Sequence, residues 1–213
     1  MDIRRLVVPL RICFGLLPVV AIGGQLLVHL RLGLGVVNFF SYFTNLANLL
    51  AAVTLLIGAW MALRARERVG FDVLRAMATV SMVVVGIVFS VLLRNADLGS
   101  LQRWVNVVVH YVMPCVIVAD WILWPPKYPL RIRELLWCQI APAAYLAYVL
   151  IRGAWVGWYP YPFFNPEAAG GYGNVAIYAI GIAGVFLLGG LVLFWIAKRL
   201  GGDFPGKAVH VRP

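Results

Sequence analysis

The sequence is poor in charged residues, and above all in acidic ones. Only 12% of the 213 residues are charged and only 8 are Asp or Glu, whereas 63% are hydrophobic and the mean hydropathy is +0.90. A soluble domain typically contains about 25% charged and about 45–50% apolar residues. The composition therefore excludes a soluble globular domain, and it excludes a disordered chain equally well. What remains is a membrane protein made of spanning helices.

The sequence also lacks the patterns of most metal, disulfide and hydrolytic sites. Its three cysteines, Cys13, Cys115 and Cys138, lie in apolar runs without metal-binding spacing. They are typical of small buried hydrophobic side chains. Neither an H-E-x-x-H zinc motif nor a G-x-S-x-G nucleophile turn occurs. We therefore expect no metal site and no cofactor.

What the sequence does contain is a series of long apolar runs. A spanning helix needs about 20 mainly apolar residues, and the stretches that provide them are 6–30, 38–63, 73–93, 103–124, 134–152 and 174–197. Prolines inside these runs are tolerated in membrane helices. The sequence predicts an all-α polytopic membrane protein, a bundle of six transmembrane helices over residues 1–200, followed by a tail at 201–213.

The basic residues predict the orientation of this bundle. Six spans place both termini on one side, and 13 of the 18 Lys and Arg residues fall on that side, among them Arg64, Arg75 and Lys127. Four fall on the other side, and Arg11 lies inside the first run. By the positive-inside rule, both termini are predicted to be cytoplasmic. The expected location is the cell membrane. The net charge of +10 is thus explained by topology, and no nucleic-acid partner is expected.

Two of the apolar runs carry polar residues at helical spacing, which places each set on one helix face. The face in run 38–63 has the spacing i, i+3, i+4 and i+7 and consists of Ser41, Thr44, Asn45 and Asn48. The face in run 103–124 has the spacing i, i+3 and i+7 and consists of Arg103, Asn106 and His110. Polar faces within the membrane must point into the bundle, so both are candidates for a functional site.

The two polar faces lie at the same predicted depth in the membrane. Thr44 and His110 lie six and seven residues from the outer ends of their runs, or about 9–10 Å along a helix. A hydroxyl and an imidazole at matched depth can form a nucleophile–base pair. The alternative is that these residues only join helices through hydrogen bonds. No carboxylate shares this depth, although Asp97 and Glu167 lie in outer loops from which either can fold back to orient the imidazole.

Two further features have structural interpretations. Arg11 and Asp120 are charged residues inside runs, both near the cytoplasmic end, and a structural ion pair is favoured over a proton relay. An aromatic cluster lies in the outer loop before the last run and consists of Trp155, Trp158, Tyr159, Tyr161, Phe163 and Phe164. For this cluster an interfacial aromatic belt is favoured over a substrate gate.

Three motifs, in this order, resemble a known family. They are F-S-Y-F-T-N-L-A-N-L-L at 40–50, V-N-V-V-V-H-Y-V-M-P at 105–114 and W-Y-P-Y-P-F at 158–163. They are similar to the bacterial relatives, sometimes called Pr-six-Pr membrane proteins, of the androgen-induced and androgen-dependent membrane hydrolases. The resemblance covers most of the chain and implies a six-helix membrane threonine hydrolase. The animal members cleave fatty acid esters of hydroxy fatty acids with one threonine and one histidine.

By this resemblance, the threonine falls on Thr44 and the histidine on His110, the same two residues that the depth argument pairs. Asn106 precedes the histidine by four residues, as in the family, whereas Pro114 follows it one residue sooner than in the animal enzymes. The resemblance and the depth argument together favour a catalytic site over helix-joining hydrogen bonds.

The resulting hypothesis is an intramembrane ester hydrolase whose partner is a lipid or fatty-acid ester taken from the membrane. His110 accepts the proton of Thr44, which attacks the ester carbonyl. The amides proposed to donate to the oxyanion are those of Asn45, Asn48 and Asn106. A carboxylate head group has two candidate ligands at the outer rim, Arg103 and Arg152. Either can instead be an interfacial anchor, and for Arg152 that role is favoured.

Two other functions remain open at this point. A small transporter or channel would use the same polar faces as its path. A haem protein would take its axial ligands from His29 and His110. The transporter is the stronger of these alternatives.

Overall fold

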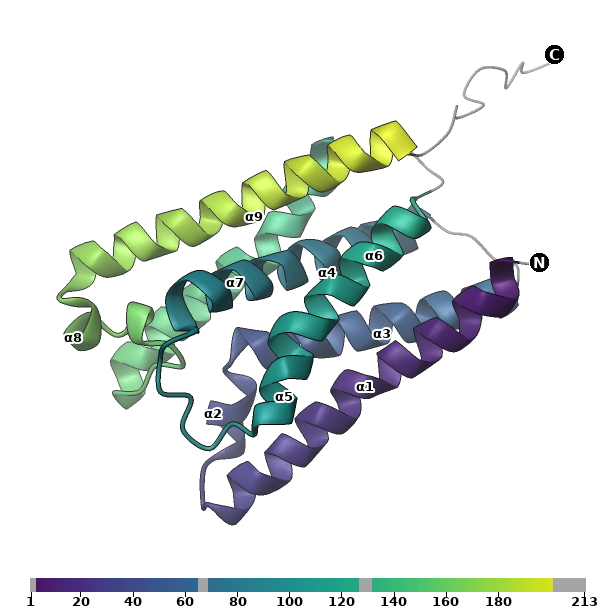
Figure 1. Ribbon diagram of the computed structural model, residues 1–213. Coiled ribbons are helices and arrows are strands. Elements are labelled where there is room, and N and C mark those ends of the chain that lie inside the picture. Colours follow the sequence, from purple (N-terminus) through teal and green to yellow (C-terminus); the bar gives the residue numbers. More distant parts are fainter. Residues whose placement is uncertain (1–2, 65–68, 127–131, 201–213) are drawn as a thin grey trace.

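The computed structural model describes residues 3–64, 69–126 and 132–200, in which every regular element is a helix (Figure 1). The first part contains α1 (Ile3–Arg31), the short α2 (Val36–Phe40), α3 (Phe43–Leu63) and α4 (Val69–Val88), which continues as the π-helix η1 (Phe89–Leu93). The middle part is one continuous rod of α5 (Arg103–Val107), the π-helix η2 (Val108–Val112) and α6 (Met113–Leu123). The last part contains α7 (Ile132–Val156), the 3₁₀-helix η3 (Pro162–Phe164), α8 (Pro166–Ala169) and α9 (Tyr172–Leu200).

Five of the described helical segments are long and apolar enough to cross a membrane. They are Leu6–Arg31, Phe43–Leu63, Gly70–Leu93, Arg103–Leu123 and Tyr172–Leu200. The chain is therefore an all-α polytopic membrane protein, but the predicted number of six spans is wrong by this measure. The missing run, 134–152, lies in α7, a helix of 25 residues that contains Glu134, Gln139, Pro142 and Arg152, all of which lower its hydropathy.

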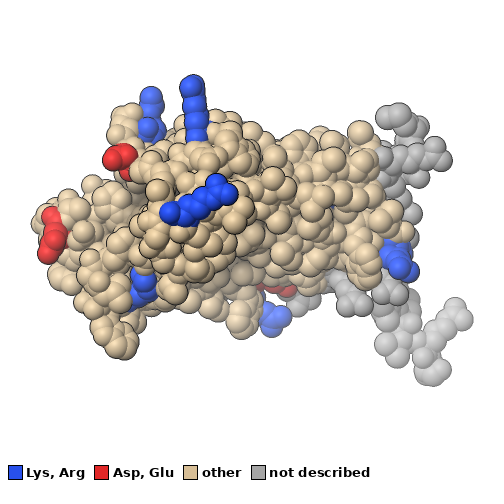
Figure 2. All heavy atoms as spheres, turned by 90° about the horizontal axis from the view of Figure 1, so that it is seen from below, with Lys and Arg blue, Asp and Glu red and all other residues tan. Residues whose placement is uncertain are grey.

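The surface of the bundle is suited to lipid. Figure 2 shows a face that is mostly uncharged, on which only a few Lys, Arg, Asp and Glu side chains are scattered. Large hydrophobic side chains face outward on several helices: Val20, Val91 and Ile180 are 63%, 71% and 73% exposed. Such a contiguous apolar surface is stable only against lipid or another apolar partner.

Helix α4 lies at the centre of the bundle, where it contacts α3, α6, α7 and α9, while α1 packs along α3. The first turn of α1 and the last turn of α9 lie at the same end of the bundle (Figure 1). The predicted tail at 201–213 and Lys127, one of the basic residues in the expected cytoplasmic loops, lie outside the described residues.

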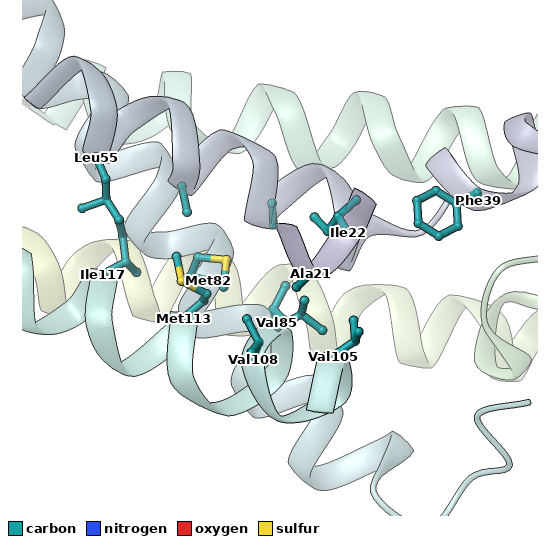
Figure 3. Close-up of a cluster of buried hydrophobic side chains, with 13 residues drawn as sticks. Ala21, Ile22, Phe39, Leu55, Met82, Val85, Val105, Val108, Met113 and Ile117 are labelled. Atoms are coloured by element: carbon teal, nitrogen blue, oxygen red, sulfur yellow. The ribbon is translucent and has the colours of Figure 1, made fainter. Parts of the chain in front are cut away.

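The main core is formed where α1, α3, α4 and the α5–η2–α6 rod meet. Figure 3 shows Met82 of α4 and Met113 of α6 side by side at its centre, with Leu55 and Ile117 toward one end and Phe39 toward the other. Small residues of α3 such as Ala47 and Ala51, which are 2% and 0% exposed, let the backbones approach closely. Close approach is the main source of helix association within lipid.

Candidate functional site

The structure brings Thr44 and His110 into contact at the end of the bundle where α3 and α5 begin. Thr44 Oγ1 lies 3.3 Å from His110 Nε2, and the two residues are only 9% and 7% exposed. Two residues 66 positions apart in the chain thus form a buried hydroxyl–imidazole pair. This contact is the geometric requirement for a threonine nucleophile with a histidine base.

Thr44 reaches this position through a break in the helix that the sequence predicted as continuous. The run 38–63 is divided into α2 and α3, with Ser41 and Tyr42 between them, so Thr44 is the second residue of α3. The prediction of one unbroken helix, and of Thr44 about 9 Å along it, is therefore wrong. The start of a new helix at Phe43 leaves its first backbone N–H groups without helical partners, and these groups become part of the site.

The free N–H groups at the start of α3 are capped by tyrosine hydroxyls from distant segments. Phe43 N–H donates to the hydroxyl of Tyr145 on α7 at 3.2 Å, and Thr44 N–H donates to the hydroxyl of Tyr161 at 3.2 Å. The Tyr161 hydroxyl also lies 3.3 Å from Thr44 Oγ1. The start of a helix carries a partial positive charge, so Thr44 Oγ1 lies where negative charge is stabilised.

Asn106 fixes the orientation and the tautomer of His110. Asn106 Oδ1 lies 2.6 Å from His110 Nδ1, and because an amide oxygen only accepts, Nδ1 must carry the proton. Nε2 is then an acceptor, and the Thr44 hydroxyl donates to it. The Phe89 ring stacks on the imidazole, with 3.9 Å between centroids and 16° between planes. The result is a Thr–His–Asn chain of hydrogen bonds.

The two acidic residues considered for this orienting role are placed elsewhere. Asp97 Oδ1 accepts from Gly99 N–H at 2.9 Å within its own loop. Glu167 lies in α8, where its N–H donates to Asn165 Oδ1 at 3.0 Å and caps that short helix. A neutral amide of the same helical rod therefore replaces the carboxylate in this site.

His110 lies in a local change of helix type. Residues Val108–Val112 form a π-helix, and Pro114 follows as the second residue of α6. Proline provides no N–H for the carbonyl one turn earlier, which widens the helix locally. On the opposite helix, Gly86 makes room for this bulge, since a Cβ at Gly86 would lie 3.3 Å from Pro114 Cβ. Such π-segments occur frequently at functional sites.

The other two asparagines hold the backbone rather than pointing at the threonine hydroxyl. Asn48 Nδ2 donates to Thr44 O at 2.9 Å and to Val109 O at 3.1 Å, which uses both of its amide hydrogens and ties α3 to η2. Asn45 Nδ2 donates to Phe39 O at 2.8 Å and closes α2 onto α3. Neither amide has a hydrogen directed at the reacting atoms, and Asn106 uses its oxygen to hold His110.

The remaining predicted residues lie at the rim of the site. Ser41 Oγ donates to Val37 O at 2.7 Å and lies 2.8 Å from the Tyr148 hydroxyl, so it joins α2 to α7. Arg103 is exposed at the first residue of α5. Arg152 lies closer to the α2–α3 break, where its guanidinium donates to Asn38 Oδ1 at 2.6 Å and lies 5.3 Å from the centre of the Trp158 ring.

Tyr161 is the residue that sequence reasoning missed. The aromatic loop was interpreted as an interfacial belt, which fits Trp155 at 87% exposure, but Tyr161, Phe163 and Phe164 are 8%, 6% and 5% exposed. Burial raises the pKa of the Tyr161 phenol above its ordinary value, so its hydroxyl stays protonated. The proline on each side of Tyr161 restricts the backbone of this segment, but it does not indicate which way the tyrosine points.

An apolar cavity opens beside Thr44. It has a volume of about 230 Å³, is partly open, and is lined by residues of α3, α4, α7, the aromatic loop and α9. Its wall includes Val84, Ala143, Ala183 and Phe186, with Thr44 and Tyr161 at the end where the dyad lies. Pockets of this kind, mostly apolar with a few polar groups in one place, are typical of binding sites for small apolar ligands.

The buried charges form a network at the opposite end of the bundle. Arg11 Nε lies 2.6 Å from Asp120 Oδ1, and Arg75 bonds the other carboxylate oxygen at 3.0 Å. Arg75, which was counted among the basic residues of the cytoplasmic side, is 5% exposed within α4 and also lies 3.4 Å from Asp72. Two arginines and two aspartates thus compensate each other where lone charges would be expensive.

Comparison with known proteins finds one family. The model of the family described as FAR-17a/AIG1-like protein matches residues 36–194, a range that contains Thr44, Asn106, His110 and Tyr161. No curated protein and no solved structure matches the chain. The matched range covers well over half of the sequence, from the start of α2 into the last turns of α9.

Proposed function

The chain belongs to the FAR-17a/AIG1-like family, and we propose that it is a membrane-embedded lipid ester hydrolase in which Thr44 is the nucleophile and His110 the general base. The observation that carries this proposal is the hydrogen-bonded order of Thr44, His110 and Asn106, at 3.3 Å and 2.6 Å. It supports a reaction because the asparagine leaves Nε2 free to accept the hydroxyl proton. The same order of nucleophile, histidine and orienting asparagine or carboxylate recurs in unrelated acyl-transfer enzymes.

The first half of the reaction is acylation of the threonine. His110 Nε2 accepts the proton as Thr44 Oγ1 attacks the ester carbonyl, and a tetrahedral intermediate forms. When the intermediate collapses, the bond to the alcohol oxygen breaks and His110 returns its proton to that oxygen. The products are the free alcohol and an acyl ester of Thr44. A water, activated by His110 in the same way, then releases the fatty acid.

The negative charge of the intermediate is stabilised at the start of α3. The Thr44 N–H group and the Tyr161 hydroxyl both lie beside Thr44 Oγ1. In the resting site the Tyr161 hydroxyl accepts from Thr44 N–H, and because the Thr44 proton points to His110, the Tyr161 proton points to Thr44 Oγ1. From there it can turn to a neighbouring oxyanion once Oγ1 has bonded to the ester carbon. Each well-placed donor of this kind contributes about 2.7–4 kcal/mol to transition-state stabilisation. We therefore assign this role to Tyr161 rather than to the asparagine amides.

The environment suits a substrate that resides in the membrane. The apolar cavity beside Thr44 receives the acyl chain, and each buried CH₂ contributes about 0.8 kcal/mol. Amphiphilic esters of the type cleaved by the animal relatives, fatty acid esters of hydroxy fatty acids, are the proposed substrates, in the cell membrane. A transporter has less support, because the polar groups of the cavity cluster mainly at its dyad end and its wall is otherwise apolar.

Hydrolysis by the purified protein tests this proposal. In detergent or in liposomes, the protein should hydrolyse a fluorogenic fatty acyl ester, and Thr44→Ala and His110→Ala should each remove the activity. Two matched controls lie elsewhere in the same fold. Thr54 is a buried threonine that bonds Leu50 O at 2.7 Å, and His29 is a histidine that bonds Gly35 O at 3.1 Å.

Thr54→Ala and His29→Gln should leave hydrolysis within a few-fold of the unmodified protein. Activity that survives in both Thr44→Ala and His110→Ala would rule out the dyad. Activity lost equally in all four variants would show that the effects come from folding alone.

A further inference from the structure

The cavity beside Thr44 is elongated along the helix axes. Its wall spans Gln139 to Leu146 on α7 and Ala179 to Phe186 on α9, which is seven residues in each case, or about 10 Å. Because α7 and α9 run in opposite directions, Gln139 and Phe186 lie at the same end. That end is the inner one, and the dyad lies at the outer one.

The inner end contains one polar group that nothing in the fold uses. The terminal amide nitrogen of Gln139 is buried and has no hydrogen-bond partner among the described residues. The polar groups at the outer end are different, because Thr44, Tyr145 and Tyr161 are all hydrogen-bonded to other protein groups. Buried donors are nearly always satisfied in folded proteins, so an unsatisfied one in a cavity wall requires an explanation.

An ordered water is a poor explanation for this donor. A buried water needs two to four polar partners, and the wall around the inner end consists of side chains such as Val84, Val85, Ala183 and Phe186. An oxygen atom carried by the ligand itself satisfies the amide without any further polar group. It also costs the ligand little, since the oxygen exchanges a hydrogen bond to water for one to the amide.

We propose that the cavity binds the acyl chain of the substrate and that Gln139 determines specificity by donating a hydrogen bond to an oxygen atom carried near the far end of that chain. This inference rests on the proposed hydrolase function and extends it to the acyl group. The preferred acyl groups are medium-length chains with a hydroxyl, ether or ester oxygen, rather than plain alkyl chains.

The size of the cavity sets the length of the chain. A protein cavity of about 150 Å³ holds benzene, with six carbon atoms, so one of about 230 Å³ holds on the order of nine. A chain of this length, extended from an ester carbonyl at Thr44, brings its last atoms to the level of Gln139. Longer chains must leave the cavity between the helices.

The test compares acyl esters of one chain length that differ by a single atom. The probes are fluorogenic esters of a nine-carbon acyl chain, plain or with one methylene replaced by an ether oxygen at successive positions. The unmodified protein is compared with Gln139→Leu and Gln139→Met, which keep the approximate volume but remove the donor. The ratio of kcat/KM for the ether and plain esters is measured in each protein.

For an oxygen near the far end, this ratio should be about two- to tenfold higher in the unmodified protein than in either variant, which is the value of one hydrogen bond. For an oxygen next to the carbonyl, the ratios should agree. Ala183→Leu is the matched control for cavity volume: it should lower kcat/KM for both esters equally and leave the ratio unchanged. Ratios that are the same in all proteins at every oxygen position would overturn the inference.

Two further measurements separate the role of Gln139 from an effect on folding and from a failure of the proposed reaction. Replacing an unpaired buried amide by an apolar side chain should leave the melting temperature unchanged or raise it, so a folded Gln139→Leu or Gln139→Met protein is expected. If the unmodified protein hydrolyses none of the esters, the hydrolase proposal fails. Displacement of a fluorescent fatty acid from Thr44→Ala protein by nine-carbon acids, with and without the distal oxygen, then decides the role of Gln139 alone.

Discussion

Tyr161→Phe removes one oxygen atom from the site and separates catalysis from capping. In the native site, the Tyr161 hydroxyl accepts from Thr44 N–H at 3.2 Å and contacts Thr44 Oγ1 at 3.3 Å. The variant keeps the ring, which stacks on Phe163 with 5.1 Å between centroids. Packing of the aromatic loop should therefore survive, and only the interactions of the hydroxyl are lost.

Two energies are expected to change. The loss of an oxyanion donor should lower kcat by about 10²- to 10³-fold, or about 2.7–4 kcal/mol, with little change in KM. The loss of the acceptor for Thr44 N–H should lower the free energy of unfolding by about 1–3 kcal/mol. At about 2–4 °C per kcal/mol for a chain of this size, the melting temperature should fall by several degrees.

Tyr145→Phe is the matched control. The Tyr145 hydroxyl caps the neighbouring group, accepting from Phe43 N–H at 3.2 Å and donating to Ser41 O at 2.8 Å, but no hydrogen bond joins it to Thr44 Oγ1. Its removal should cost a similar amount of stability and lower kcat by less than tenfold. Both proteins are assayed for ester hydrolysis and for thermal unfolding in detergent. If the two variants lose kcat equally, or if Tyr161→Phe stays within threefold of native, Tyr161 is a cap and not a catalytic group.

Variants at three further positions test the residues that support the site and the fold. Asn106→Leu should lower kcat by about 10²-fold or more, because nothing then fixes the tautomer and orientation of the imidazole. Asn106→Asp should retain most of the activity. Steady-state kinetics checks both variants, and KM should be unchanged. Asp120→Asn leaves Arg11 buried without a counter-ion and Arg75 paired with Asp72 alone. It should destabilise the protein by about 3–5 kcal/mol, seen as a lower melting temperature with unchanged kcat per folded molecule. Gly153→Ala places a Cβ in the ring of Tyr159, so the aromatic loop must move. The free energy of unfolding should fall by about 1–3 kcal/mol. A melting temperature and a kcat equal to those of the native protein would contradict this.

Much of the fold follows from the sequence because a membrane helix leaves a strong local signal. The run 174–197 lies within α9, and 6–30 lies within α1, because apolar length alone defines such segments. The run 134–152 is the exception. It forms a helix as expected, but its Glu, Gln, Pro and Arg residues keep α7 outside the set of strongly apolar spans.

The dyad was predicted for a reason that is partly wrong. The pairing of Thr44 with His110 assumed two straight helices entering the membrane at the same level, but α3 begins at Phe43 and Thr44 lies in its first turn. The residues still meet because the short α2 and the π-helix around His110 bring the two side chains together. Hydrophobic periodicity cannot indicate a break of two residues or a π-turn, since neither changes the apolar content of the run.

The parts of the site that remained hidden are those that come from another region of the chain. Asn106 was on the correct face, and its contact with His110 is a local i, i+4 contact that the spacing allows. Tyr161 lies 117 residues from Thr44 in the chain. No local pattern distinguishes an inward tyrosine from an interfacial one in a loop of six aromatic residues. Only the packing of the loop against η1, α7 and α9 determines its direction.

The irregular parts of this bundle coincide with its chemistry. The α2–α3 break provides free N–H groups at Thr44, the π-helix η2 turns His110 toward them, and the π-helix η1 places Phe89 flat against the imidazole. Each irregularity gives up regular helical hydrogen bonds inside a membrane, where unsatisfied backbone groups are costly. At the start of α3, the hydroxyls of Tyr145 and Tyr161 replace the missing hydrogen bonds by accepting from Phe43 and Thr44 N–H. Because the caps are hydroxyls, they can also donate, so the same atoms that make the helix break tolerable form a site able to receive negative charge.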